Sequence, residues 1–204
     1  MKYQFDPAEL TSEKSLWDVY KLSCRIRPSW VQVAINCIAT LLLVANAFFL
    51  NGDTKALLSD VRGWASNGFN FAITTLGFLI AGFTIFTTLA KPGMMLAMMD
   101  HRDSETGLPT MKKNFFAFMR VFIAYLVCAG IYLAVILFGQ AGGVLVKIVQ
   151  LMPAASCVRD FAIKISYVIV GGSFVYLLLM LKAFVFNIYA IVMNFLRWEC
   201  AQEE

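Results

Sequence analysis

Four long apolar runs constrain this chain most, because each could cross a lipid bilayer as a helix. They cover residues 30–50, 69–90, 115–138 and 165–196. A helix of about 20 apolar residues spans the ~30 Å hydrocarbon layer. Lipid satisfies no backbone hydrogen bonds, and the runs lack the polar/apolar alternation of barrel strands. The sequence therefore predicts an all-α integral membrane protein, a four-helix transmembrane bundle.

The composition supports a membrane setting. Hydrophobic residues make up 60% and charged residues 15% of the chain, with a mean hydropathy of +0.72. Soluble domains average roughly 45–50% apolar and about 25% charged residues. Too few polar residues remain to cover a soluble core, so lipid must cover it. We expect a lead at 1–29, a transmembrane domain at 30–198 and a polar tail at 199–204.

The last apolar run exceeds one membrane thickness. We expect a span at 165–185, after spans at 30–50, 69–90 and 115–138. Residues 186–198 then form an aromatic-rich extension of the fourth helix into the cytoplasm. Such a helix is too apolar to stand free in water, so it should pack against the lead, a neighbouring subunit or a partner.

Lysine and arginine indicate the orientation. Ten of them fall in the lead and around the loop between the second and third runs, against five in the other two loops. Cytoplasmic loops carry such an excess. We therefore expect both termini in the cytoplasm. Cys24 and Cys200 would lie inside and Cys157 outside, with Cys37 and Cys128 in spans, so no disulfide should form across the outer loops.

Polar and small residues recur along one side of the second run at steps of four and three. They are Asn70, Thr74, Gly77, Ala81, Thr84 and Thr88. Such residues favour a helix-packing seam, and a water-exposed stripe along a pore is the alternative. The first run carries a second polar stripe of Gln32, Asn36 and Thr40. Because amides are costly in hydrocarbon, we expect the two stripes to face each other or a shared axis.

Two cations, Arg120 and Lys182, interrupt the apolar runs near the predicted cytoplasmic boundary. Long side chains at this depth reach the headgroups by snorkelling. A gate, a partner contact or an intramembrane ion pair are the alternatives. No carboxylate lies in any span, which argues against a proton-coupled transporter.

The loop after the second run is rich in methionine and charge. Methionine suits adaptable binding surfaces, although an interfacial turn of helix would have the same composition. We expect this loop to bind a cytosolic protein through Met94, Met98, Asp100, Arg102, Lys112 and Lys113.

No constellation in the chain predicts chemistry. Asp100, His101, Asp103 and Glu105 lie close in sequence, but a solvated loop explains them better than a metal site. The chain holds one histidine and no nucleophile motif. We predict no catalytic residue, no metal, no cofactor, no enzyme activity and no direct contact with nucleic acid.

The outer loop at 142–153 is unusually apolar and too short to span a membrane. It could lie in the outer interface or cap the bundle. A surface of this kind could sense the state of the membrane or a foreign ligand.

Two segments resemble a known family. They are Gly77-Phe78-Leu79-Ile80-Ala81-Gly82-Phe83-Thr84-Ile85-Phe86-Thr87-Thr88 and, where the chain re-enters the membrane, Lys112-Lys113-Asn114-Phe115-Phe116-Ala117-Phe118. Together with the four spans, these segments resemble small tetraspan proteins of bacterial antiviral islands, namely the membrane subunits (KwaA) of Kiwa anti-phage defence systems. The resemblance implies an inner-membrane oligomer that detects phage attack. It also implies a cytosolic DNA-binding partner (KwaB-like) on the cytoplasmic face. It carries over no catalytic residue.

The sequence therefore predicts a non-enzymatic sensor or scaffold of an anti-phage complex in the bacterial inner membrane. Four short spans bury little alone, so we expect a homo-oligomer among membrane lipids, with a tetramer as our guess. The alternative is a pore-forming effector that permeabilises the membrane on activation, with Asn36, Thr74 and Lys182 lining or gating the conduit. A small-molecule transporter is a weaker third reading.

Overall fold

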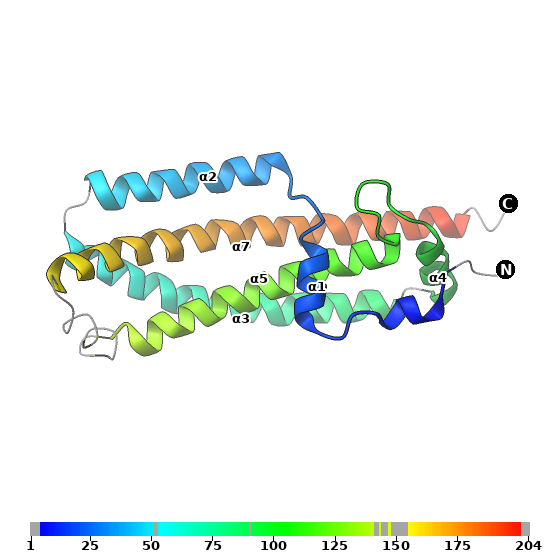
Figure 1. Cartoon of the computed structure of the whole chain (residues 1–204), viewed down its shortest axis with the longest axis horizontal. Helices are drawn as coiled ribbons and strands as arrows, with labels where there is room; N and C mark the ends of the chain where they lie inside the picture. Colours follow the sequence, from blue (N-terminus) through cyan, green and yellow to red (C-terminus); the bar gives the residue numbers. More distant parts are fainter. Residues whose placement is uncertain are drawn as a thin grey trace. The chain divides into compact units, whose positions relative to one another are not determined.

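The computed structural model describes residues 5–50, 53–89, 91–140, 143, 147 and 155–200. Four long helices account for most of them (Figure 1): α2 (Trp30–Ala45), continued by the π-helical turn η2 (Asn46–Leu50), then α3 (Thr54–Leu89), α5 (Thr110–Phe138) and α7 (Ala155–Cys200). Each has a stretch long and apolar enough to cross a membrane. The predicted all-α class and the four apolar helices are confirmed for the described residues.

The described residues also form short helices: η1 (Pro7–Thr11) and α1 (Leu16–Ser23) lie in the lead before α2, and α4 (Pro92–Asp100) lies between α3 and α5. Local sequence sets their starts. Asp6 caps η1, and Ser15 with Asp18 forms a reciprocal capping box on α1. Pro92 stands in the first turn of α4, where its missing N–H is not needed.

The helix α2 begins at Trp30, as predicted, but α3, α5 and α7 begin earlier than their apolar runs do. Residues 54–68, which we predicted as an outer loop, form the first turns of α3. They are helical because Leu57, Val61 and Ala65, spaced four apart, are at most 2% exposed and bury one face of the helix. In the same way α5 starts at Thr110 and α7 at Ala155.

The fourth helix runs unbroken from Ala155 to Cys200, so the predicted span at 165–185 and the extension at 186–198 form one element. Of the apolar outer loop at 142–153, only residues 143 and 147 are described, and of the polar tail at 199–204 only 199 and 200 are. The prediction that the outer loop lies in the interface falls mostly outside the described residues.

The contacts divide the chain into two compact units, and the boundary crosses α3, α5 and α7. The first unit holds the lead up to Arg27, residues 77–123 and the chain from Met180 onward. Its core is aromatic. The ring of Phe83 meets Phe115, Phe118 and Phe122 edge-on at centroid distances of 5.5–5.7 Å, and Phe118 packs on Phe184.

The second unit holds residues 28–76 and 124–179. Buried tyrosines connect its helices through hydroxyl hydrogen bonds. The Tyr125 hydroxyl donates to the Leu177 carbonyl at 3.0 Å, and the Tyr132 hydroxyl shares a 2.7 Å hydrogen bond with Ser173 Oγ. A buried phenol needs such partners, so these bonds fix α5 against α7 within this unit.

Gly68 on α3 gives a test of this packing. A Cβ at Gly68 would lie 2.8 Å from Tyr132 Cε2 and 2.9 Å from Phe174 Cζ, whereas nothing lies within 4 Å of a Cβ at Gly63. Gly68→Ala should lower the free energy of unfolding by about 1–3 kcal/mol through overpacking. Gly63→Ala should be neutral or stabilise the helix by up to about 1 kcal/mol. Thermal unfolding in detergent measures both, and equal losses in the two variants would contradict this packing.

Candidate functional site

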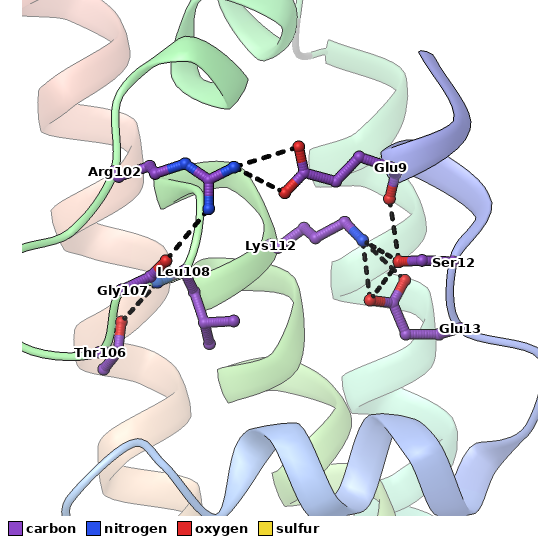
Figure 2. A network of polar contacts seen from close by, with 8 residues as sticks. All are labelled: Glu9, Ser12, Glu13, Arg102, Thr106, Gly107, Leu108 and Lys112. Atoms are coloured by element: carbon purple, nitrogen blue, oxygen red, sulfur yellow. Dashed lines mark hydrogen bonds and ion pairs between the residues drawn. The ribbon is translucent and has the colours of Figure 1, made fainter. Parts of the chain in front are cut away.

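A cluster of charged side chains joins the lead to the loop between α4 and α5 in the first unit (Figure 2). We call it the charged cap. Its members are Glu9, Ser12 and Glu13 from the lead, with Arg102, Asp103, Lys112 and Lys113 from the loop and the start of α5.

Lys112 is the centre of the charged cap. It is only 9% exposed, which is costly for a cation unless it is paired. Its Nζ donates to both carboxylate oxygens of Glu13 at 2.7 and 2.8 Å, and to Ser12 Oγ at 2.8 Å. The ammonium group thereby uses its three donors on the lead, and Figure 2 shows the three bonds converging on it.

The charge of Glu13 depends on this contact. Burial alone would raise the pKa of its carboxyl group, but the hydrogen bonds from Lys112 and Ser12 outweigh burial and hold the pKa below its usual value. Glu13 therefore stays ionised and serves as the counter-ion of Lys112.

Arg102 makes a looser contact above this pair. Its Nη2 lies 3.0 and 3.3 Å from the carboxylate oxygens of Glu9, and its Nη1 donates to the Gly107 carbonyl at 3.4 Å. The Arg102 side chain is 60% exposed. Exposed pairs of this kind contribute about 0–1 kcal/mol, so Arg102 is available to other partners.

Asp103 organises the loop itself. It accepts from Lys113 Nζ at 2.6 Å, from Thr106 Oγ1 at 2.7 Å and from the Thr106 amide at 2.9 Å. The Lys113 hydrogen bond, followed by those of Thr106, lowers the pKa of Asp103 to about 2. Gly107 closes the turn with a φ of 69°, a left-handed conformation that glycine adopts without strain.

Two further contacts tie the same unit together. Arg120 Nη1 donates to the Ile26 carbonyl at 2.7 Å, so the predicted intramembrane cation holds the end of the lead against α5. Lys91, just before α4, pairs with Glu199 near the end of α7. Lys182, the other predicted cation, is exposed and has no partner among the described residues.

The six residues predicted to bind a partner do not form one open surface. Met94 is 4% exposed and belongs to the core. Met98 is half-buried and lines a cavity of about 20 Å³ that includes Met94 and Met111. Asp100 and Arg102 are exposed, whereas Lys112 and Lys113 are engaged with Glu13 and Asp103. The methionine segment is therefore mostly internal packing.

The lead's acceptors were missed by reasoning from the sequence. Glu9 and Glu13 lie four residues apart, and the basic residues they meet lie 93 and 99 positions further on. The lead and the loop each carry charges of both signs, so nothing in the sequence set which residues pair.

The stripe on α3 lies on the outside of the described chain. All six of its residues are exposed: Asn70, Thr74, Gly77, Ala81, Thr84 and Thr88. The hydroxyls of Thr84 and Thr88 donate to carbonyls of their own helix at 2.9 and 2.8 Å. Asn70 and Thr74 have no side-chain hydrogen bond to a described residue.

The stripe on α2 contacts the helix α7. Gln32 Nε2 donates to the Leu179 carbonyl of α7 at 3.5 Å, and Thr40 Oγ1 donates to the Asn36 carbonyl at 2.8 Å. Asn36 Oδ1 is buried without a partner in the described chain. Because Gln32 bonds to α7 and both Asn70 and Thr74 are exposed, no side-chain hydrogen bond joins the two stripes within the second unit. That the stripes share an axis stays a prediction.

The cysteines are free: Cys24, Cys157 and Cys200 are exposed, as is Cys37, and Cys128 is buried. Among the described residues, no group of three or more His, Cys, Asp or Glu side chains could hold a metal ion. Comparison with known proteins adds no relative, because no family model, no curated protein and no solved structure matches this chain.

The charged cap predicts unequal effects for its two glutamates. Glu13→Gln leaves the nearly buried Lys112 without its counter-ion and should weaken docking of the lead by about 1–3 kcal/mol. Glu9→Gln breaks only the exposed Arg102 pair and should change it by at most about 1 kcal/mol. Amide hydrogen exchange across residues 7–23 measures this docking. Equal loss of protection in the two variants would contradict the claim that the Lys112–Glu13 pair contributes most to the docking of the lead.

The loop should respond to acid through Asp103. The folded pKa is depressed from 3.8 to about 2, so its stabilisation is complete above the unfolded value and is lost as the pH falls from about 4 to 2. Hydrogen exchange of residues 103–110, corrected for intrinsic rates, should show protection falling in this window. Asp103→Asn should lack this protection already at pH 6 and respond little to acid. A wild-type loop insensitive to pH from 5 to 2 would contradict the assignment.

Proposed function

We propose that the protein is a non-enzymatic sensor or scaffold of an anti-phage complex in the bacterial inner membrane, with both termini in the cytoplasm. On this proposal it recruits or controls a cytosolic DNA-binding partner, as the resemblance to the Kiwa membrane subunit implies. The observation that carries the proposal is the charged cap, in which a salt bridge from Glu13 to the nearly buried Lys112 holds the lead at the start of α5.

The contacts of the first unit support the proposed sidedness. The lead meets the start of α5 through Glu13 and Lys112, and the end of α7 meets the start of α4 through Glu199 and Lys91. Segments in contact at the ends of membrane helices lie on one side of the bilayer. These segments carry the larger share of Lys and Arg, which favours the cytoplasmic side.

Arg102 is the group of the charged cap best suited to a partner. Its side chain is 60% exposed and forms one weak ion pair, with Glu9. Arginine binds carboxylates through paired, planar hydrogen bonds and is enriched at protein interfaces. We therefore assign the partner contact to Arg102 and Asp100 at the surface. Met94 and Met98 support this contact by packing the helix α4 against the rest of the unit.

Charge reversal tests this contact. Arg102→Glu should reduce recovery of a co-purifying cytosolic DNA-binding protein at least tenfold in detergent pull-downs. A glutamate at position 102 would repel the carboxylates of the partner that Arg102 is proposed to bind. Arg159→Glu is the matched control, since Arg159 is also paired with a carboxylate and is 59% exposed. Its recovery should equal that of the wild type.

A double variant separates partner binding from folding of the charged cap. Glu9→Lys combined with Arg102→Glu restores an opposite-charge pair within the chain but keeps the reversed charge at position 102. The proposal predicts that recovery stays low in the double variant. Recovery restored to the wild-type level would mean that Arg102 acts only by holding the lead.

The exposed α3 stripe favours a second candidate function, an oligomeric pore. Asn70 and Thr74 are polar, exposed and without a partner in the described chain, so copies of the chain could place them at a mutual contact or around a water-filled lumen. Lys182 is also exposed, and Asn36 would be drawn into the conduit. Conductance of purified protein in planar bilayers separates the two functions, because a scaffold should stay silent and a pore should conduct on activation.

A further inference from the structure

An open groove of about 560 Å³ lies in the second unit between α2, α3 and α7. Its walls are mainly apolar and include Ala39, Leu42 and Leu43 of α2 with Phe174 and Val175 of α7. We propose that this groove binds one acyl chain of a membrane phospholipid. The proposal needs only that the four apolar helices cross a membrane, so it is independent of the defence function and of any protein partner.

The size and lining of the groove fit a small apolar ligand. Sites for such ligands measure about 300–1,000 Å³ and combine apolar walls with a few placed polar groups. Here the polar groups are Asn46, Trp64 and Asn67. Gly171 forms the floor, where a Cβ would lie 2.9 Å from Trp64 Cζ3 and 3.0 Å from Leu43 Cδ1. The absence of a side chain there lets both walls meet the α7 backbone.

The setting selects hydrocarbon as the occupant. The helices that form the groove are apolar enough to cross a membrane. At its rim Leu42 is 66% exposed, as is the neighbouring Leu41, and such side chains face lipid in a bilayer. An open groove on that surface is therefore reached by acyl chains before any water-soluble molecule.

One end of the groove is polar, which matches a lipid entering from a membrane face. Asn46 Nδ2 donates to the Tyr167 hydroxyl at 2.8 Å, and the Trp64 ring packs on Tyr167 with centroids 4.7 Å apart. Both polar residues therefore lie at one level. Ala39 stands seven residues before Asn46 on the same helix, about 10 Å deeper along its axis. The groove thus runs from an amide and an indole to apolar walls that include Ala39 and Phe174.

Asn67 supplies a free polar group beside this path. Its amide is exposed and has no hydrogen bond to a described residue, and an amide in hydrocarbon is costly without a partner. An ester carbonyl or phosphate oxygen of the bound phospholipid can accept from it while the acyl chain follows the apolar walls. One lipid thereby supplies a hydrogen-bond acceptor for the Asn67 amide and fills the groove.

Fluorescence quenching of Trp64 tests the site. The full chain, with Trp17, Trp30 and Trp198 replaced by Phe, is delipidated in detergent and titrated with phosphatidylcholine carrying dibrominated acyl chains. Quenching should saturate at about one lipid per chain. Ala39→Phe fills the groove and should abolish the saturable phase, leaving the shallow linear quenching caused by lipid mixing in the micelle. Ala134→Phe, at an exposed position of α5 in the same unit, should keep it.

Native mass spectrometry of the chain with all four tryptophans provides the second readout, independent of the Trp replacements. One phospholipid should remain on the wild type and on Ala134→Phe, and be lost from Ala39→Phe. Equal linear quenching and equal lipid content in the three proteins would overturn the proposal. Ala39→Phe that keeps its lipid but falls from an oligomer to a monomer would overturn it too, by assigning the groove to a second copy of the chain.

Discussion

Hydrocarbon offers no hydrogen-bond partners, and this constraint governs how the polar groups of the long helices are arranged. The tyrosine hydroxyls of α5 bond to α7, Gln32 bonds to the Leu179 carbonyl, and the α3 threonines Thr84 and Thr88 bond to their own helix. Several groups have no partner in the described chain, among them Asn36 Oδ1 and the side chains of Asn67, Asn70, Thr74 and Lys182. These exceptions mark where lipid or another copy of the chain should complete the structure.

The two units meet this constraint in different ways. In the second unit Asn67, one of these groups, borders an apolar groove, so lipid is its natural complement. In the first unit charge is concentrated outside the spans, and the lead folds back so that Glu13 neutralises Lys112. The charged cap leaves Arg102 as its exposed cation. A membrane-facing groove and a charged surface in one small chain suit a protein that links the state of a membrane to a soluble partner.

The fold class could be predicted from the apolar runs, because a helix satisfies its own backbone hydrogen bonds in lipid. The helix starts did not follow, because packing at Leu57, Val61 and Ala65 extends α3 beyond the point where apolarity ends. The α3 stripe was found from its spacing, but its direction depends on tertiary contacts that no periodicity reports. The charged cap was out of reach for the same reason, since Lys112 and Glu13 are 99 residues apart. The burial of Met94 could not be predicted either, because composition alone does not separate a binding surface from a core.

The sidedness of the chain is the central claim, and its own cysteines test it directly. Cys24, Cys157 and Cys200 are exposed and free, so a membrane-impermeant maleimide can report the side of each on spheroplasts, with the other two replaced by Ser. The account predicts that Cys157 is labelled in intact spheroplasts, whereas Cys24 and Cys200 are labelled only after the membrane is permeabilised. Labelling of Cys24 or Cys200 in intact spheroplasts, with Cys157 protected, would contradict it.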